Sequence, residues 1–294
     1  GNSVMPLVFL GVSAVLNIVL DLIFIVKFNL GVAGAAEATV ISQYVSGMGI
    51  TIYALLKSTH FRIKLKHLKF DMNIVKELAN LSILTALQQS VMNFGILLVQ
   101  GLVNSFGTIV MAAFAAAVKI DTLAYSPVQD FGNAVSTFVA QNYGAGKHRR
   151  IKDGWKQSMI AASVFCVCVS AVVFIFAEKF MGLFVSDGTE IIKVGAGYLR
   201  IEGSFYIGIG ILFLLYGFYR AVGKPEMSLI LTIISLGTRV VLAYALSAIS
   251  KIGVIGIWIS VPIGWFLADM TGLLYMKKLP LLKSRFRKKY DLHI

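Results

Sequence analysis

The chain has 294 residues, of which 57% are hydrophobic and only 14% are charged, and its formal net charge is +13. Soluble domains usually carry roughly 25% charged residues, and a globule of this length cannot hide so much apolar surface behind so few charges. The composition therefore argues against a water-soluble enzyme, a disordered chain and a nucleic-acid-binding domain, and it leaves a membrane protein with several spans.

Eight apolar runs are long enough to cross ~30 Å of hydrocarbon as helices. They cover residues 6–27, 32–56, 78–103, 108–135, 155–177, 195–219, 227–249 and 253–276. The sequence thus predicts an all-α polytopic membrane protein with eight transmembrane helices.

The positive charge is unevenly distributed between the links that join these runs. Twenty of the 27 Lys and Arg residues lie in the links 57–76, 147–156 and 220–224 and in the C-terminal segment 277–289, whereas only four lie in the opposite links. Because Lys and Arg mark the cytoplasmic side, the basic links and the C-terminus are expected in the cytoplasm. The charge is therefore a topology signal, and nucleic acid is not an expected partner.

The first two runs contain a candidate cation site. Asp21 follows Asn17 by four residues, so both lie on one helix face. The chain turns near Asn29, which brings Thr39 of the second run to a similar depth. A carboxylate, an amide oxygen and a hydroxyl suit a hard cation such as Na⁺, and a buried carboxylate also takes a proton readily. The alternative is a hydrogen-bonded contact between the helices with no role in coupling.

Polar residues in the third and fourth runs are candidates for lining a substrate cleft. The third run carries a polar stripe of Gln89, Asn93, Gln100 and Asn104, which indicates either the wall of a water-filled cleft or amide contacts between helices. The fourth run carries Lys119, Asp121 and Tyr125, which either face the cleft or include a structural Lys–acid pair.

Further features of the later runs predict structural roles. Pro127 and Pro262 are expected to kink their helices. Glu202 and Arg239 both lie toward the outer half of the membrane, and we predict an ion pair between them. Several aromatic residues of the sixth run either stack on a cationic compound or simply pack: Phe205, Tyr206, Tyr216, Phe218 and Tyr219.

Motifs for nucleotide and metal chemistry are missing from the sequence. It has no Gly-x-x-x-x-Gly-Lys-Ser/Thr and no His-Glu-x-x-His, and its four His residues lie in the basic links or the C-terminal segment. The sequence therefore predicts neither an enzyme nor a cofactor, and no metal beyond Na⁺ at Asp21.

An internal repeat relates the two ends of the chain. A shift of 222 residues aligns the first two runs with the last two, including Gly-Val-x-Gly at 31–34 and 253–256. The repeat predicts a six-span unit over 78–276, and residues 1–56 match only the last two spans of such a unit. Residues 57–77 are expected to form a basic cytoplasmic linker, and residues 277–294 a basic cytoplasmic tail.

Several motifs make the chain resemble the multidrug and toxin extrusion (MATE) family of cation-coupled antiporters. They include Leu-Asn-Ile-Val-Leu-Asp at 16–21, Ala-Gln-Asn-Tyr-Gly-Ala-Gly at 140–146 and Arg-Ala-Val-Gly-Lys-Pro at 220–225. The resemblance implies a twelve-helix fold with two six-helix lobes around a cleft. Residue 1 of this chain corresponds to the start of the family's fifth helix, so the chain is expected to lack the first four helices.

The resemblance also implies a function. Asn17, Asp21 and Thr39 match the cation site of one prokaryotic branch, although that branch's acidic partner on the first helix is absent from this chain. The implied activity is proton- or sodium-coupled export of small organic, often cationic, compounds across the plasma membrane, by a protein expected to be monomeric. The alternatives are a flippase for lipid-linked saccharides from the wider superfamily, and a non-transporting remnant.

Overall fold

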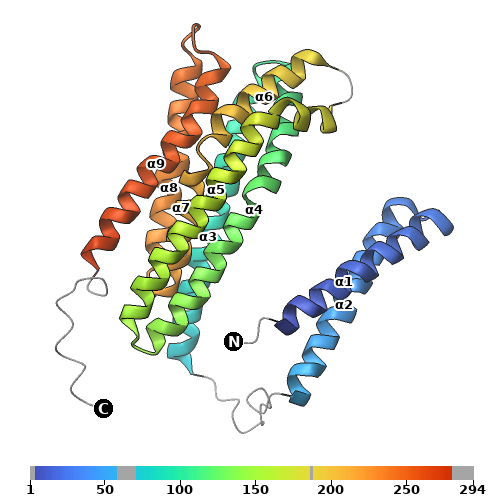
Figure 1. Ribbon diagram of the computed structural model, residues 1–294, viewed down its shortest axis with the longest axis vertical. Coiled ribbons are helices and arrows are strands. Elements are labelled where there is room, and N and C mark those ends of the chain that lie inside the picture. Colours follow the sequence, from blue (N-terminus) through green and yellow to red (C-terminus); the bar gives the residue numbers. More distant parts are fainter. Residues whose placement is uncertain (1–3, 58–70, 186–187, 280–294) are drawn as a thin grey trace. The chain divides into compact units, whose positions relative to one another are not determined.

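The computed structural model describes residues 4–57, 71–185 and 188–279, and its regular elements in these ranges are helices (Figure 1). They form two compact units, residues 1–72 and 73–294. The predicted linker over 57–77 and the tail over 277–294 lie mostly outside the described residues.

The smaller unit is an antiparallel helical hairpin. Helix α1 (Val4–Asp21) passes directly into a π-helical segment, η1 (Leu22–Lys27), and the chain then turns into α2 (Gly31–Lys57). The turn uses positive φ angles at Asn29 (53°) and Gly31 (55°), which suit Asn and Gly better than other residues. The sequence predicted a single uniform helix over 6–27, and the π-helical segment is a departure from it.

The hairpin corners show why the Gly-Val-x-Gly motif occurs twice. Gly31 and its repeat counterpart Gly253 have φ angles of 55° and 53°. The last glycine of each motif packs closely against the preceding part of the chain: a Cβ on Gly34 would come within 2.9 Å of Leu30, and one on Gly256 within 2.6 Å of Leu246. Both corners therefore need a residue with a left-handed backbone conformation at the first position of the motif and a residue without a side chain at the fourth.

The larger unit contains seven helices within its described residues. They are α3 (Met72–Asn104), α4 (Thr108–Gly144), α5 (His148–Phe184), α6 (Thr189–Gly203), α7 (Tyr206–Ala221), α8 (Pro225–Ser247) and α9 (Val254–Lys278). Helix α4 packs along α5, α6 and α7, while α7 also contacts α5, α8 and α9. Helices α4 and α7 are thus the centre of the bundle.

The sixth predicted run, residues 195–219, is not one straight helix. It is divided into α6 and α7, which are bent by 53° at the break. Ser204 lies at this break and donates a hydrogen bond to the Arg200 carbonyl at 2.5 Å, a back-bond that commonly bends helices. In contrast, α4 continues as a helix through Pro127 and α9 continues through Pro262. Kinks at these two prolines remain predictions.

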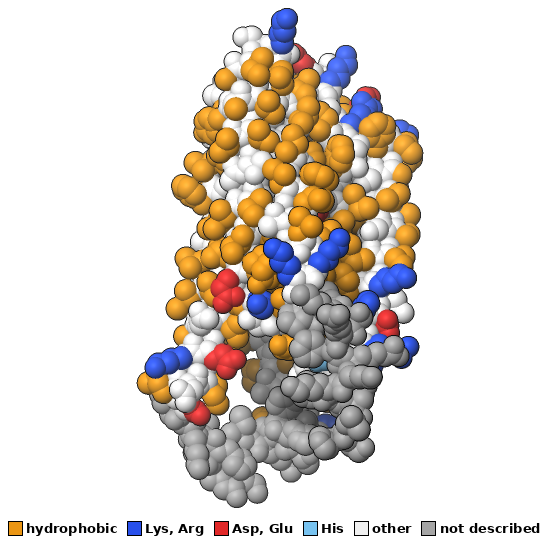
Figure 2. Space-filling model, turned by 90° about the vertical axis from the view of Figure 1, so that its left-hand side faces the viewer, with side chains coloured by type: hydrophobic (Ala, Val, Ile, Leu, Met, Phe, Trp, Pro, Cys, Tyr) orange, Lys and Arg blue, Asp and Glu red, His pale blue; other side chains and the backbone are white. Residues whose placement is uncertain are grey.

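The helices have the length and composition of membrane spans. Seven of those in the described residues can cross a membrane singly, and the bent α6–α7 pair adds an eighth. Many large apolar side chains are exposed on the bundle, and Figure 2 shows them as a broad band with Lys and Arg side chains toward its two ends. Helices α4 and α5 have 37 residues each, about 55 Å at 1.5 Å per residue, so they extend beyond the hydrocarbon.

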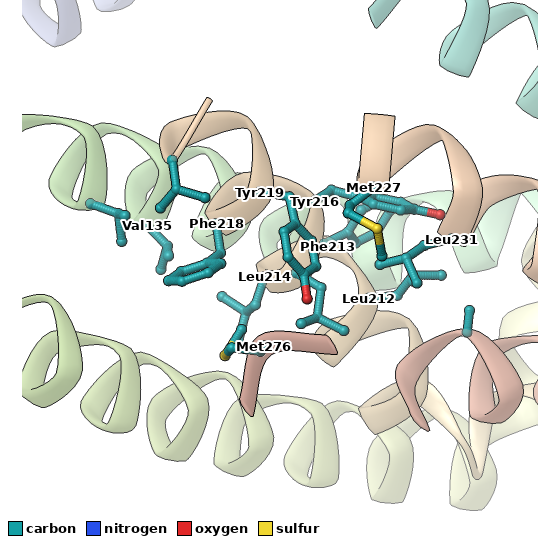
Figure 3. Close-up of a cluster of buried hydrophobic side chains, with 14 of the residues drawn as sticks. Val135, Leu212, Phe213, Leu214, Tyr216, Phe218, Tyr219, Met227, Leu231 and Met276 are labelled. Carbon is teal, nitrogen blue, oxygen red and sulfur yellow. The ribbon is translucent and has the colours of Figure 1, made fainter. Parts of the chain in front are cut away.

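The bundle interior is packed with aromatic and aliphatic side chains. Figure 3 shows the cluster around α7, in which Tyr216, Phe218 and Tyr219 are buried against α4, α8 and α9. The Tyr219 hydroxyl donates a hydrogen bond to the Gly272 carbonyl at 2.6 Å. These aromatic residues, and the buried Tyr206, therefore serve packing, whereas Phe205 is exposed.

Candidate functional site

The smaller unit brings together two of the three predicted cation-site residues. Asn17 of α1 donates its Nδ2 hydrogen to the Thr39 hydroxyl of α2 at 3.3 Å. The Thr39 hydroxyl in turn donates to the Ala35 carbonyl at 2.9 Å. The antiparallel hairpin thus places the Asn17 and Thr39 side chains at one depth, whereas the distances from the turn predicted that Asp21 would lie level with Thr39.

The third residue, Asp21, is the last residue of α1 and immediately precedes η1. Its Oδ1 atom is buried and has no hydrogen-bond partner. A buried carboxylate oxygen without a partner is costly, and a π-helical turn inside a helix is often found at functional sites. Asp21 lies one helical turn from Asn17, so the two side chains lie on the same face of the helix.

The oxygen atoms of Asn17, Asp21 and Thr39 suit a monovalent cation or a proton. They belong to one carboxylate, one amide and one hydroxyl, and the described residues contain no group of three or more His, Cys, Asp or Glu side chains that could hold a metal ion. The Asn17 amide oxygen and the Asp21 carboxylate remain as acceptors. Either a bound proton or a small cation would satisfy the buried Asp21 oxygen.

The predicted polar stripe on α3 has an ordered arrangement of amides. Gln89 donates to Asn93 at 3.4 Å and Gln100 donates to Asn104 at 2.9 Å. Gln89 and Asn93 are exposed on the larger unit, whereas the neighbouring Gln88 is buried. The stripe is therefore available on the surface of that unit, and its amides bond to each other within α3.

The three predicted cleft residues of α4 do not share one surface. Lys119 is exposed and Tyr125 is partly buried, but Asp121 is only 1% exposed. Residues two apart on a helix point about 200° away from each other, so Lys119 and Asp121 face opposite sides. Within the described residues no ion pair joins Lys119 to Asp121, and Asp121 is buried in the interior of the larger unit.

Asp121 is part of a buried acidic cluster that the sequence did not reveal as a group. The Tyr206 hydroxyl donates a hydrogen bond to Asp121 Oδ1, and Tyr198 adjoins both Asp121 and Glu202. Asp121 Oδ2 and Glu202 Oε2 are buried without hydrogen-bond partners. The signal for this cluster is the four-residue spacing of Tyr198 and Glu202, which places these two side chains toward one face of α6.

Glu202 and Arg239 are close enough to interact electrostatically but do not form a direct ion pair. Within the described residues, the ion pairs within 4.0 Å are Arg149–Asp153 and Arg200–Glu178. Arg239 Nε is buried without a hydrogen-bond partner, as is Glu202 Oε2. The functional role of this pair stays a prediction.

A charge swap tests the interaction between Glu202 and Arg239. Glu202→Arg and Arg239→Glu are each expected to lower thermal stability, because each leaves two like charges near one another. The double swap is expected to recover part of the lost stability. A double-mutant cycle of thermal unfolding should then give a coupling free energy of about 0.5–3 kcal/mol between the two residues. A double variant that rescues neither single variant would contradict the interaction.

Removal of one hydroxyl tests the buried cluster. Tyr206→Phe is expected to destabilise the protein by about 1–3 kcal/mol, because Asp121 then loses its buried donor. Thermal unfolding in detergent measures this loss, and Tyr244→Phe is the matched control because Tyr244 is 48% exposed. Equal unfolding temperatures for the two variants would show that the hydrogen bond contributes nothing.

Known proteins resemble this chain over most of its length. The MatE family model matches residues 83–245. The probable multidrug resistance protein YpnP of Bacillus subtilis is 29% identical over 94% of the chain, and the probable multidrug resistance protein NorM of Thermotoga maritima is 27% identical over 98%. The chain spans 61% and 62% of the lengths of these two relatives.

Solved structures extend the likeness to the fold. An outward-facing structure of a multidrug resistance MATE family transporter of the MOP superfamily matches 92% of the chain with a TM-score of 0.85 and 26% identity. The chain spans 61% of that protein. A MOP superfamily transporter from Pyrococcus furiosus, described as having a binding pocket of reverse polarity, matches with the same TM-score and 25% identity.

Proposed function

Because the chain belongs to the MatE family, we propose that it works in a multi-pass secondary antiporter that exports small organic, often cationic, compounds in exchange for protons or sodium ions. The names of its curated relatives describe drug resistance and export rather than catalysis. We further propose that Asn17, Asp21 and Thr39 bind the coupling ion.

One observation carries the proposed ion site. The buried Asp21 Oδ1 has no hydrogen-bond partner, although it lies one turn from the Asn17–Thr39 contact. A bound ion supplies the missing partner and neutralises the carboxylate, so the ion-bound and ion-free hairpins differ in energy. The ion shifts the protein between two arrangements to the extent that it binds this hairpin more tightly in one of them than in the other.

The coupling follows from this difference. An ion that binds more tightly to one arrangement of the protein favours that arrangement, and a substrate that binds more tightly to the other opposes it. Ion entry and substrate exit are then linked without any cofactor or nucleotide. The exposed amides on α3 and the exposed Lys119 are our candidates for contacts with the substrate.

Transport in vesicles tests the proposed function. The protein is reconstituted into liposomes that contain a fluorescent organic cation, and an inward gradient of either protons or sodium ions is imposed. Dye release driven by one of the two gradients is expected, and the effective gradient identifies the coupling ion. Release that depends on neither gradient would contradict ion-coupled export.

The orientation of the protein is a separate proposal. We infer that the basic ends of the helices and the C-terminus face the cytoplasm, because Lys and Arg gather there. In a variant without Cys166 and Cys168, Lys251→Cys is expected to react with an impermeant thiol reagent in intact cells. Lys147→Cys is expected to react only after the membrane is opened, and the reverse pattern would overturn the orientation.

A further inference from the structure

A groove at the basic end of the larger unit has no part in the proposed transport cycle. It lies between the first turns of α5 and the last turns of α9 and has a volume of about 690 Å³. Helices α5 and α9 both pack against α7, so their spacing is set within the packed bundle. The described residues that line the groove all belong to these two helices.

Positive charge dominates the mouth of this groove. Lys152 and Lys156 of α5 and Lys277 of α9 line it and are exposed. The acidic lining residue is Asp153, and Asp153 forms an ion pair with Arg149 at 3.9 Å. The acid is therefore already balanced by a neighbouring cation, and the three lysines leave the mouth net positive.

The wall below the mouth is apolar and lipid-accessible. Met270 and Leu274 lie one turn apart on α9 and are 44% and 53% exposed. Lys277 and Met270 are seven residues apart, which corresponds to about 10 Å along the helix. The apolar strip therefore runs from the charged mouth into the depth at which the acyl chains of a lipid begin.

An aromatic side chain fixes the other wall. Trp155 of α5 is partly buried and meets the Phe218 ring edge-on, with 5.1 Å between the ring centroids. Phe218 is itself fully buried. The Trp155 ring is thus held in place by α7, and it presents an amphipathic surface at the level where membrane proteins commonly place Trp.

We propose that this groove binds one anionic glycerophospholipid, with its phosphate at Lys152, Lys156 and Lys277 and an acyl chain along Met270 and Leu274. Basic pockets between helices on the cytoplasmic side are suited to acidic headgroups. A zwitterionic lipid brings its own cation and leaves the three lysines repelling one another. A soluble anion would satisfy the lysines but leave the apolar strip uncovered.

Fluorescence quenching measures this binding directly. The chain is placed in phosphatidylcholine nanodiscs with increasing amounts of phosphatidylglycerol that carries dibrominated acyl chains. Trp155 is the partly exposed member of the three Trp residues, because Trp258 and Trp265 are 2% and 5% exposed. Saturable quenching is expected in the wild-type chain and is expected to be lost in Trp155→Phe.

Two sets of variants separate a site from general surface charge. Replacing Lys152, Lys156 and Lys277 together with Gln is expected to weaken phosphatidylglycerol binding at least about tenfold, since each Lys near an acidic lipid surface contributes about fivefold. The same three replacements by Arg are expected to retain binding. The matched control removes three exposed cations of the larger unit that do not line the groove, Lys76, Lys147 and Arg150, and is expected to change affinity less than twofold.

Three results would overturn the proposal. Brominated phosphatidylcholine that quenches as strongly as brominated phosphatidylglycerol would remove the headgroup preference. An equal loss in the control triple variant would show general surface attraction. Quenching that persists unchanged in Trp155→Phe would place the lipid elsewhere. None of these results bears on ion-coupled export, because the assay contains neither substrate nor an ion gradient.

Discussion

Replacing Asp21 with Asn is expected to reduce ion-driven dye export at least about tenfold, equivalent to about 1.4 kcal/mol or more, while the protein still inserts into the membrane. Asparagine has nearly the same shape as aspartate, but its amide neither takes up a proton near neutral pH nor carries a negative charge. The buried Oδ1 position would then have no charge for an ion to neutralise. The loss should therefore appear in coupling and not in folding.

Glu37→Gln is the matched control for this variant. Glu37 is an exposed acid on the same helix as Thr39, and two residues of separation turn it about 200° away from Thr39. The control removes one negative charge from the same hairpin and should keep wild-type export. Export by the two variants is measured in the same vesicles at equal protein content. Ion-driven export of wild-type strength in Asp21→Asn would refute the role of Asp21.

Adding one methyl group at Gly217 is expected to destabilise the larger unit strongly. A Cβ on Gly217 would lie 2.1 Å from the Gly132 carbonyl oxygen, and a Cβ on Gly132 would lie 2.6 Å from the Phe213 carbonyl oxygen. Helices α4 and α7 therefore approach backbone to backbone at these glycines, as small residues allow in membranes. Because no flexible side chain can move aside, Gly217→Ala should force the two helices apart at a cost of about 1–3 kcal/mol or more.

Gly237→Ala is the control for that substitution. Gly237 lies within α8, and a Cβ there meets nothing within 4 Å. Alanine favours a helix over glycine by about 0.5–1 kcal/mol, so this variant should be neutral or slightly more stable. Thermal unfolding of the two variants in one detergent separates them. A melting temperature of Gly217→Ala equal to that of the wild type would show that the backbones do not approach so closely.

Much of the fold follows from local properties of the sequence. A run of about 20 apolar residues must form a helix in hydrocarbon, and each of the eight predicted runs corresponds to a helix or to the α6–α7 pair. The meeting of Asn17 with Thr39 was also predictable, because a hairpin fixes which residues lie at equal distances from its turn.

Other features depend on contacts between distant parts of the chain. Residues 195–219 are long enough to form one span although they include Arg200 and Glu202, and their spacing alone did not predict the bend between Gly203 and Tyr206. Spacing alone also does not say which side of α4 faces the bundle, and for that reason the burial of Asp121 by Tyr206 was missed. The gap between Glu202 and Arg239 likewise depends on how α6 and α8 are held by the rest of the unit.

Ion binding measured at equilibrium tests the central claim most directly. The purified protein is titrated with the ion identified by transport, by radioactive sodium binding or by proton release into a dilute indicator. We predict that wild-type protein binds an ion that a cationic dye displaces, and that Asp21→Asn no longer binds it whereas Glu37→Gln still does. Unchanged binding and displacement in Asp21→Asn would contradict the assignment of this hairpin as the coupling site.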